Sequence, residues 1–196
     1  LQAIAKEVAP LRSAHQDAIL LNEALFKRIK TVWEGRDRAG LNPEQRMLLE
    51  RVYRRFARNG ALLEAAGKER LRVINSELAS LGVKFADNLL KEMNAYRLVI
   101  ENREDLSGLP ERLVLAAADT ARKAGLDGKW VFTLHGPSLW PFLQYADHRE
   151  LRRRMFEAYI TRGAHSPATA TAKLCARMAA LRAERDLIAR IADTSP

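Results

Sequence analysis

The longest periodic pattern of apolar residues lies between Gly67 and Arg97. Apolar side chains recur every three or four residues, at Leu71, Ile74, Leu78, Leu81, Phe85, Leu89, Met93 and Tyr96. This spacing puts all eight on one side of an α-helix. The positions between them are mostly polar, Lys68, Asn88 and Glu92 among them. The pattern predicts a helix roughly 45 Å long, at a rise of about 1.5 Å per residue, which would be the spine of a helical domain.

Five further segments show helical spacing of apolar residues. They cover residues 1–33, 42–59, 110–125, 149–162 and 168–192. In the second of these, Asn42 is expected to cap free backbone N–H groups, and Pro43 suits the first helical position. We expect Pro10 to kink or divide the first helix, because proline lacks a backbone donor.

Two short stretches, Leu98–Ile100 and Lys129–Leu134, have the β-branched and aromatic composition of strands. We expect them to pair, in a direction that the sequence leaves open. His135–Ser138 has the composition of a turn, and Leu139–Tyr145 is a compact apolar segment. The sequence thus predicts a mainly α fold. Residues 1–196 would form a single multi-helix region with a long central helix and a small two-stranded β element.

The overall composition is ordinary, with 47% hydrophobic and 29% charged residues in a chain of 196. No apolar run reaches the ~18 residues of a membrane span, so we expect no membrane partner. The chain opens without a signal peptide and without an initiator Met, which we interpret as a piece of something longer. The formal net charge of +9 permits an acidic partner, including nucleic acid.

Cys175 is the only cysteine, which excludes an internal disulfide and a zinc site built on thiolates. This usage predicts a reducing, cytoplasmic compartment. Cys175 lies between Leu174 and Ala176 in a helical pattern. We therefore interpret it as a small packed residue rather than a nucleophile.

The histidines give no metal-binding pattern. They are His15, His135, His148 and His165. A catalytic zinc helix carries two histidines at i, i+4 spacing, and no pair here has it. We expect surface or loop positions for all four. Phosphate-loop, dinucleotide-binding and nucleophile-elbow motifs are also missing. We assign no catalytic residue, no metal ligand and no cofactor within this chain, and the substrate-binding residues stay unknown.

Two predicted helices carry clusters of arginine. The first cluster is Arg51, Arg54, Arg55 and Arg58, and the second is Arg149, Arg152, Arg153 and Arg154. Either could grip the phosphates of a nucleic acid. We favour solvated faces paired with Glu44, Glu50 and Glu150, because no recognised nucleic-acid-binding module accompanies the charge.

The aromatic segment Trp130–Tyr145 also has two interpretations. It could line a ligand groove. We favour core packing at the junction of sheet and helix, with part of the segment bordering a cleft.

The order of several segments carries a resemblance. These are Ile19–Phe26, Gly40–Glu50, Arg70–Leu81, Phe85–Lys91, Lys129–Leu134, Pro137–Leu143, Tyr145–Arg152 and Ala158–Gly163. The succession resembles the M3 family of zinc metallopeptidases, in particular its peptidyl-dipeptidase (dipeptidyl carboxypeptidase) and oligopeptidase A branch. No single piece is specific, but the order and spacing are.

The resemblance implies a fragment of the N-terminal, non-catalytic half of a longer, mostly helical peptidase. In that family two halves enclose a channel for short peptides, and an H-E-x-x-H helix with a downstream glutamate holds zinc. These ligands have no counterpart in this sequence. We therefore expect an inactive wall of the peptide channel, whose partners are a missing C-terminal catalytic half and, in the parent enzyme, short peptides. Exposed apolar surface would favour self-association. The alternative is a stand-alone helical binding module left from a peptidase, with nucleic-acid binding less favoured.

Overall fold

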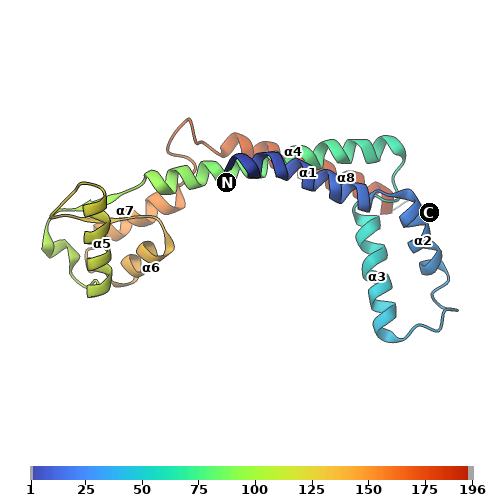
Figure 1. Cartoon of the computed structure of the whole chain (residues 1–196), viewed down its shortest axis with the longest axis horizontal. Coiled ribbons are helices and arrows are strands. Elements are labelled where there is room, and N and C mark those ends of the chain that lie inside the picture. Colours follow the sequence, from blue (N-terminus) through green and yellow to red (C-terminus); the bar gives the residue numbers. More distant parts are fainter. Residues whose placement is uncertain (1, 194–196) are drawn as a thin grey trace. The chain divides into compact units, whose positions relative to one another are not determined.

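The computed structural model describes residues 2–193 (Figure 1). The elements in this range are α1 (Gln2–Leu20), α2 (Glu23–Glu34), α3 (Pro43–Arg58), α4 (Ala65–Ala95), β1 (Leu98–Ile100), the short 3-10 helix η1 (Arg103–Leu106), α5 (Glu111–Lys123), β2 (Trp130–Phe132), α6 (Gly136–Tyr145), α7 (Arg149–Ile160) and α8 (Ala172–Asp193). The mainly α fold, the long helix and the two-stranded element are confirmed. Leu1, which was predicted to open the first helix, lies outside the described residues.

The chain separates into two compact units. The first comprises the residues up to Phe85 together with those from Lys173 onward, and the second comprises Ala86–Ala172. The assignment of residues 1–196 to a single helical region stays a prediction.

In the first unit, α2 and α3 form a hairpin held by aromatic rings. The ring of Phe26 stacks on Tyr53 at 5.7 Å between centroids, and Trp33 stacks on the same tyrosine at 4.7 Å. Asn42 caps α3 as predicted, in a capping box with Gln45 in which each side chain bonds the backbone N–H of the other residue. The hairpin therefore has both a packed interior and a fixed helix start.

The first predicted helix is divided, but at a different place from the one expected. Pro10 lies inside α1, and the break falls at Leu21 and Asn22. The Asn22 side chain accepts a hydrogen bond from the backbone N–H of Leu25 at 2.9 Å and so starts α2. An N-cap that satisfies a free donor determines this boundary, not the proline.

The N-terminal part of α4 lies antiparallel to α8, held by two double hydrogen-bonded ion pairs. Arg70 contacts Glu184 at 2.6 and 2.8 Å, and Arg177 contacts Glu77 at 2.6 and 2.7 Å. Between these pairs lie apolar residues such as Ile74 and Leu181, both fully buried. Bidentate arginine–carboxylate pairs have a defined geometry, so they fix the register of the two helices.

In the second unit the two strands pair antiparallel, with Leu98 opposite Phe132 and Ile100 opposite Trp130. This settles the direction that the sequence left open. Helices α5, α6 and α7 surround the strands, and the unit has one continuous apolar core. That core comprises Leu98, Ile100, Leu106, Leu113, Ala117, Phe132, Leu134, Leu139, Phe142, Ala146, Leu151, Met155 and Ala158.

The turn predicted at His135–Ser138 is wrong in part. Helix α6 already begins at Gly136 and runs to Tyr145, and His135 is its N-cap residue. The backbone carbonyl of His135 accepts hydrogen bonds from Ser138 and Leu139, both at 2.9 Å. Pro137 is tolerated because the first turn of a helix has no intrahelical use for its N–H.

The apolar stripe of α4 is less buried than its periodicity predicts. Leu71 and Ile74 are buried, whereas Leu78, Leu81, Phe85, Leu89, Met93 and Tyr96 are only half-buried. Four polar residues of the same helix are buried instead, namely Lys68, Asp87, Asn88 and Glu92. The environment of α4 is therefore partly polar.

Candidate functional site

The residues considered for metal or nucleophilic chemistry are not brought together. All four histidines are exposed, as predicted. His148 lies 3.7 Å from the Asp105 carboxylate, and His165 hydrogen-bonds the Thr161 hydroxyl at 2.6 Å. Across residues 2–193 no group of three or more His, Cys, Asp or Glu side chains could hold a metal ion. Cys175 is exposed, so its interpretation as a packed residue is wrong.

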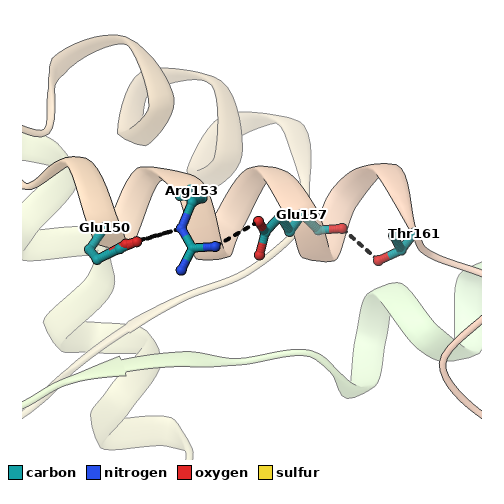
Figure 2. A network of polar contacts seen from close by, with 4 residues as sticks. All are labelled: Glu150, Arg153, Glu157 and Thr161. Carbon is teal, nitrogen blue, oxygen red and sulfur yellow. Dashed lines mark hydrogen bonds and ion pairs between the residues drawn. The ribbon is translucent and has the colours of Figure 1, made fainter.

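Two arginines of α7, Arg152 and Arg153, bond to groups of the chain itself. Figure 2 shows Glu150, Arg153, Glu157 and Thr161 in a row along the helix, one turn apart. Arg153 donates to both glutamates, at 3.0 Å in the case of Glu157, and its hydrogen bond and charge lower the pKa of Glu150. Arg152 donates to the backbone carbonyls of Ala146 and Asp147. Within the described residues, Arg153 alone of this cluster forms an ion pair, so the paired interpretation is confirmed for Arg153 only.

The arginine cluster of α3 also contains one paired residue. Arg54 pairs with Glu50 at 2.6 Å. Arg51, Arg55 and Arg58 are exposed, and the part of the chain that the structure describes offers none of them an ion pair. Only one arginine of this cluster therefore fits the paired interpretation.

Part of the aromatic segment is core, as favoured. Phe132 and Phe142 are fully buried and lie 4.7 Å apart between ring centroids. Trp140 and Tyr145 are exposed, and Trp140 makes an edge-to-face contact with Tyr159 at 5.2 Å. The guanidinium of Arg162 stacks on the ring of the same Tyr159, 3.8 Å from its centroid.

Glu92 organises a loop of the second unit. Its carboxylate accepts hydrogen bonds from the backbone N–H groups of Gly163 and Ser166 and from the hydroxyl of Thr169. Desolvation, the largest single influence, would raise the pKa of Glu92, but these three donors and the nearby His165 together hold that pKa below its usual 4.5. Glu92 is therefore a buried anion that fixes the connection between α7 and α8.

The first unit has a groove of about 600 Å³ along α1 and α4. Its lining combines polar side chains with apolar ones. The polar residues are Arg12, Ser13, Gln16, Asp17, Asn59, Asn75 and Arg185, and the apolar ones are Ala5, Val8, Ala9, Leu20, Leu78, Ala79 and Val83. Amide and guanidinium groups beside aliphatic ones suit binding of a polar chain such as a peptide.

Asp17 is the one carboxylate in the lining of this groove. It is 6% exposed and accepts one side-chain hydrogen bond, from the Asn75 amide at 2.8 Å. Burial raises the pKa of Asp17 above its usual 3.8, and Asn75 and Arg72 oppose that shift only in part. The lining holds no histidine or second acid, so the groove is suited to binding and not to paired acid–base chemistry.

Sequence reasoning missed the burial of the carboxylates Asp17 and Glu92. Asp17 sits among polar residues of α1 and Glu92 at a polar position of α4, so neither interrupts a periodic pattern. Their partners lie 58 and 71 residues away along the chain. No local signal marks them, because contacts at such separations exist only in the folded chain.

Comparison with known proteins gives a consistent result. No protein-family model matches the chain. Dipeptidyl carboxypeptidase of Escherichia coli (strain K12) is 35% identical over 167 residues, which are 85% of this chain and 24% of that protein. Dipeptidyl carboxypeptidase of Salmonella typhimurium is 33% identical over 181 residues, 92% of this chain and 26% of that protein. Oligopeptidase A of Escherichia coli (strain K12) is 29% identical over 157 residues, 80% of this chain and 23% of that protein.

These matches confirm the resemblance seen in the order of the segments. No helix of the described chain is both long and apolar enough to cross a membrane. The chain spans about a quarter of the length of the curated relatives. Over that span it belongs to the M3 family of dipeptidyl carboxypeptidase and oligopeptidase A.

Proposed function

We propose that this chain is a non-catalytic helical part of a longer M3-type peptidase and forms a wall of its peptide-binding channel. The observation that carries the proposal is the match of 85% of the chain to 24% of a dipeptidyl carboxypeptidase. A segment that aligns almost throughout with a small part of a peptidase supports a contributing role within such an enzyme. The parent protein would act on short peptides in the cytoplasm.

Zinc chemistry would belong to the rest of the parent protein. The four histidines show no H-E-x-x-H spacing, and residues 2–193 offer no cluster of metal ligands. The residues described here do not fit a zinc ion, so we derive no catalytic step from them. The chain alone would be inert toward peptides.

The groove along α1 and α4 is the best candidate for the channel-facing surface. It offers Gln16, Asn59 and Asn75 as partners for a peptide backbone, and Arg12 and Arg185 as partners for carboxylates. Its apolar residues would contact the side chains of the peptide.

A chimera tests this role. The aligned segment of the E. coli dipeptidyl carboxypeptidase is replaced by this chain, and steady-state kinetics on short peptides are compared with and without Arg12→Ala. A channel-wall role predicts an active chimera in which Arg12→Ala raises KM several-fold and leaves kcat unchanged, because only binding is weakened. Unchanged KM in the Arg12→Ala chimera would contradict the groove assignment. Zinc-dependent cleavage by the isolated chain, abolished by a chelator, would contradict the non-catalytic role.

A further inference from the structure

The α2–α3 hairpin carries a second groove, of about 360 Å³, whose lining is almost entirely apolar. It is lined by Arg28, Ile29, Val32, Leu41, Gln45, Leu48, Leu49 and Val52. Two of its apolar side chains are well exposed, Leu48 at 64% and Val32 at 50%. These apolar side chains line a concavity and are open to water. A partner that covers them removes apolar surface from water, which makes the free energy of binding more favourable.

The hairpin presents this groove on a firm support. Phe26 packs on Tyr53 and Phe56 on the inner side of the two helices, and Trp33 stacks on Tyr53. The capping box at Asn42 fixes the start of α3. A partner would therefore meet a preformed surface and would lose little free energy to ordering it.

The hairpin carries a surplus of positive charge. Residues 23–58 contain ten Lys and Arg but only five Asp and Glu. Arg51 and Arg55 follow Leu48 by three and seven residues, which places them along the same side of α3. Arg28 lies in the groove lining itself. Within the described residues, none of these three arginines has an ion pair.

We propose that this groove is a docking site for an amphipathic helix of a partner protein, with an apolar stripe flanked by carboxylates. Its apolar residues at i, i+3, i+4 and i+7 would cover Val32, Leu48 and their neighbours, as in other helix-in-groove complexes. Its carboxylates would pair with Arg28, Arg51 and Arg55. The proposal is independent of the channel-wall role.

Two other occupants fit the surface less well. A nucleic acid would use the arginines but would leave the apolar lining without a partner. A second copy of this chain carries a formal charge of +9, so two copies repel each other. An acidic amphipathic helix satisfies both the apolar lining and the unpaired positive charge.

The experiment measures binding of the full chain to fluorescent peptides of about 18 residues, a length that forms a helix on contact. The probe carries leucines at i, i+3, i+4 and i+7 with flanking glutamates. One control peptide has the same composition in scrambled order, and a second has lysine in place of glutamate. We expect binding of the acidic amphipathic peptide only, weakening steeply as salt is raised.

Variants of the chain locate the site. Leu48→Gln should weaken binding about tenfold, because it removes apolar contact. The change should leave the fold intact, since Leu48 is exposed and glutamine is a good helix former. The matched control is Leu187→Gln on α8, at a leucine 60% exposed, with no expected effect. Arg55→Gln should weaken binding about threefold and reduce its salt dependence, whereas Arg149→Gln on α7 should not.

Several outcomes would overturn the proposal. One is equal binding of the acidic and the scrambled peptides, and another is binding that Leu48→Gln leaves unchanged. Concentration-dependent dimerisation abolished by Leu48→Gln would identify a second copy as the occupant. Displacement of the peptide by a generic DNA duplex at physiological salt would assign the surface to nucleic acid.

Discussion

Each of the two units contains a buried carboxylate, Asp17 in the first and Glu92 in the second. The fold shifts the pKa values of these two groups in opposite directions. Asp17 in the first unit has a raised pKa, and Glu92 in the second has a lowered one. Their exposures are similar, 6% and 9%. Asp17 accepts one side-chain hydrogen bond, whereas Glu92 accepts three hydrogen bonds, two of them from the backbone. The additional donors favour the ionised form of Glu92, whereas burial outweighs the single donor of Asp17.

This difference separates two kinds of structural role. Glu92 and the glycine that donates to it hold a loop in one conformation, so the anion stabilises the second unit. Asp17 borders the open groove of the first unit and is stabilised poorly as an anion. Four substitutions test this contrast, in order of expected effect.

Gly163→Ala should have the largest effect, about 3 kcal/mol of lost stability. Gly163 has φ +89°, a backbone conformation that disfavours any residue with a Cβ. The Cβ of an alanine at this position would also lie only 2.8 Å from Thr171 Oγ1 and 2.9 Å from Leu89 Cδ2. Urea unfolding followed by circular dichroism measures the loss. The control is Gly125→Ala, with φ +72° but open space around the Cβ, which should lose only about 1 kcal/mol. Equal losses would show that the Gly163 loop is not tightly held.

Glu92→Gln should cost about 2 kcal/mol at neutral pH, because the amide group cannot accept all three hydrogen bonds. The lowered folded-state pKa also sets a pH dependence. The stabilisation by Glu92 is complete above its unfolded pKa of about 4.5 and disappears as pH falls through its lower folded pKa.

Two measurements check this prediction. In thermal unfolding, the wild type should lose more stability below about pH 4.5 than the variant does, because other carboxylates with lowered pKa values remain in both proteins. Hydrogen exchange at the amides of Gly163 and Ser166 should be faster in the variant at neutral pH. The control, Glu104→Gln, changes an exposed glutamate of the same unit and should alter neither. Unchanged exchange in Glu92→Gln would contradict the loop-holding role.

Asn75→Ala should destabilise the first unit by about 1.5 kcal/mol at pH 7, because it removes the amide donor of the buried Asp17 carboxylate. The loss should shrink at pH 3, where Asp17 is protonated. Urea unfolding at the two pH values measures both quantities. A loss that is equal at pH 7 and pH 3 would mean that Asn75 acts by packing and not through the Asp17 charge.

Asp17→Asn should have the smallest effect and the opposite sign to Glu92→Gln, a gain of less than about 1 kcal/mol at neutral pH. A raised folded-state pKa means that the fold favours the protonated acid. The penalty is therefore absent below the unfolded pKa of about 3.8 and appears as pH rises through the folded value. Unfolding curves of variant and wild type should converge at low pH. A large loss at neutral pH would show that Asp17 is a needed anion and would remove the contrast with Glu92.

Much of the secondary structure could be predicted because its signals are local. The cap at Asn42, the strands at Leu98–Ile100 and Lys129–Leu134 and the long helix were all visible as short-range patterns. The errors arose where two local signals competed. Pro10 was expected to divide the first helix, but the cap at Asn22 does so, and Pro137 suggested a turn where α6 begins.

The candidate site was much less predictable. The two arginine clusters look alike in sequence, yet Arg153 is paired on both sides while Arg55 has no ion pair among the described residues. Whether an arginine forms an ion pair or a hydrogen bond within the chain depends on where glutamates and carbonyl groups lie around its helix. Sequence spacing predicts this only for neighbours one turn away.

The sequence by itself determined the helical elements, the family and the surplus of positive charge, because these depend on residue identity and on contacts within one or two helical turns. Only the tertiary structure decided which polar groups are buried, which arginines lack an ion pair, and where the grooves lie. Glu92 and Gly163 show the physical reason: they are 71 residues apart, and their hydrogen bond exists only when the chain brings them together.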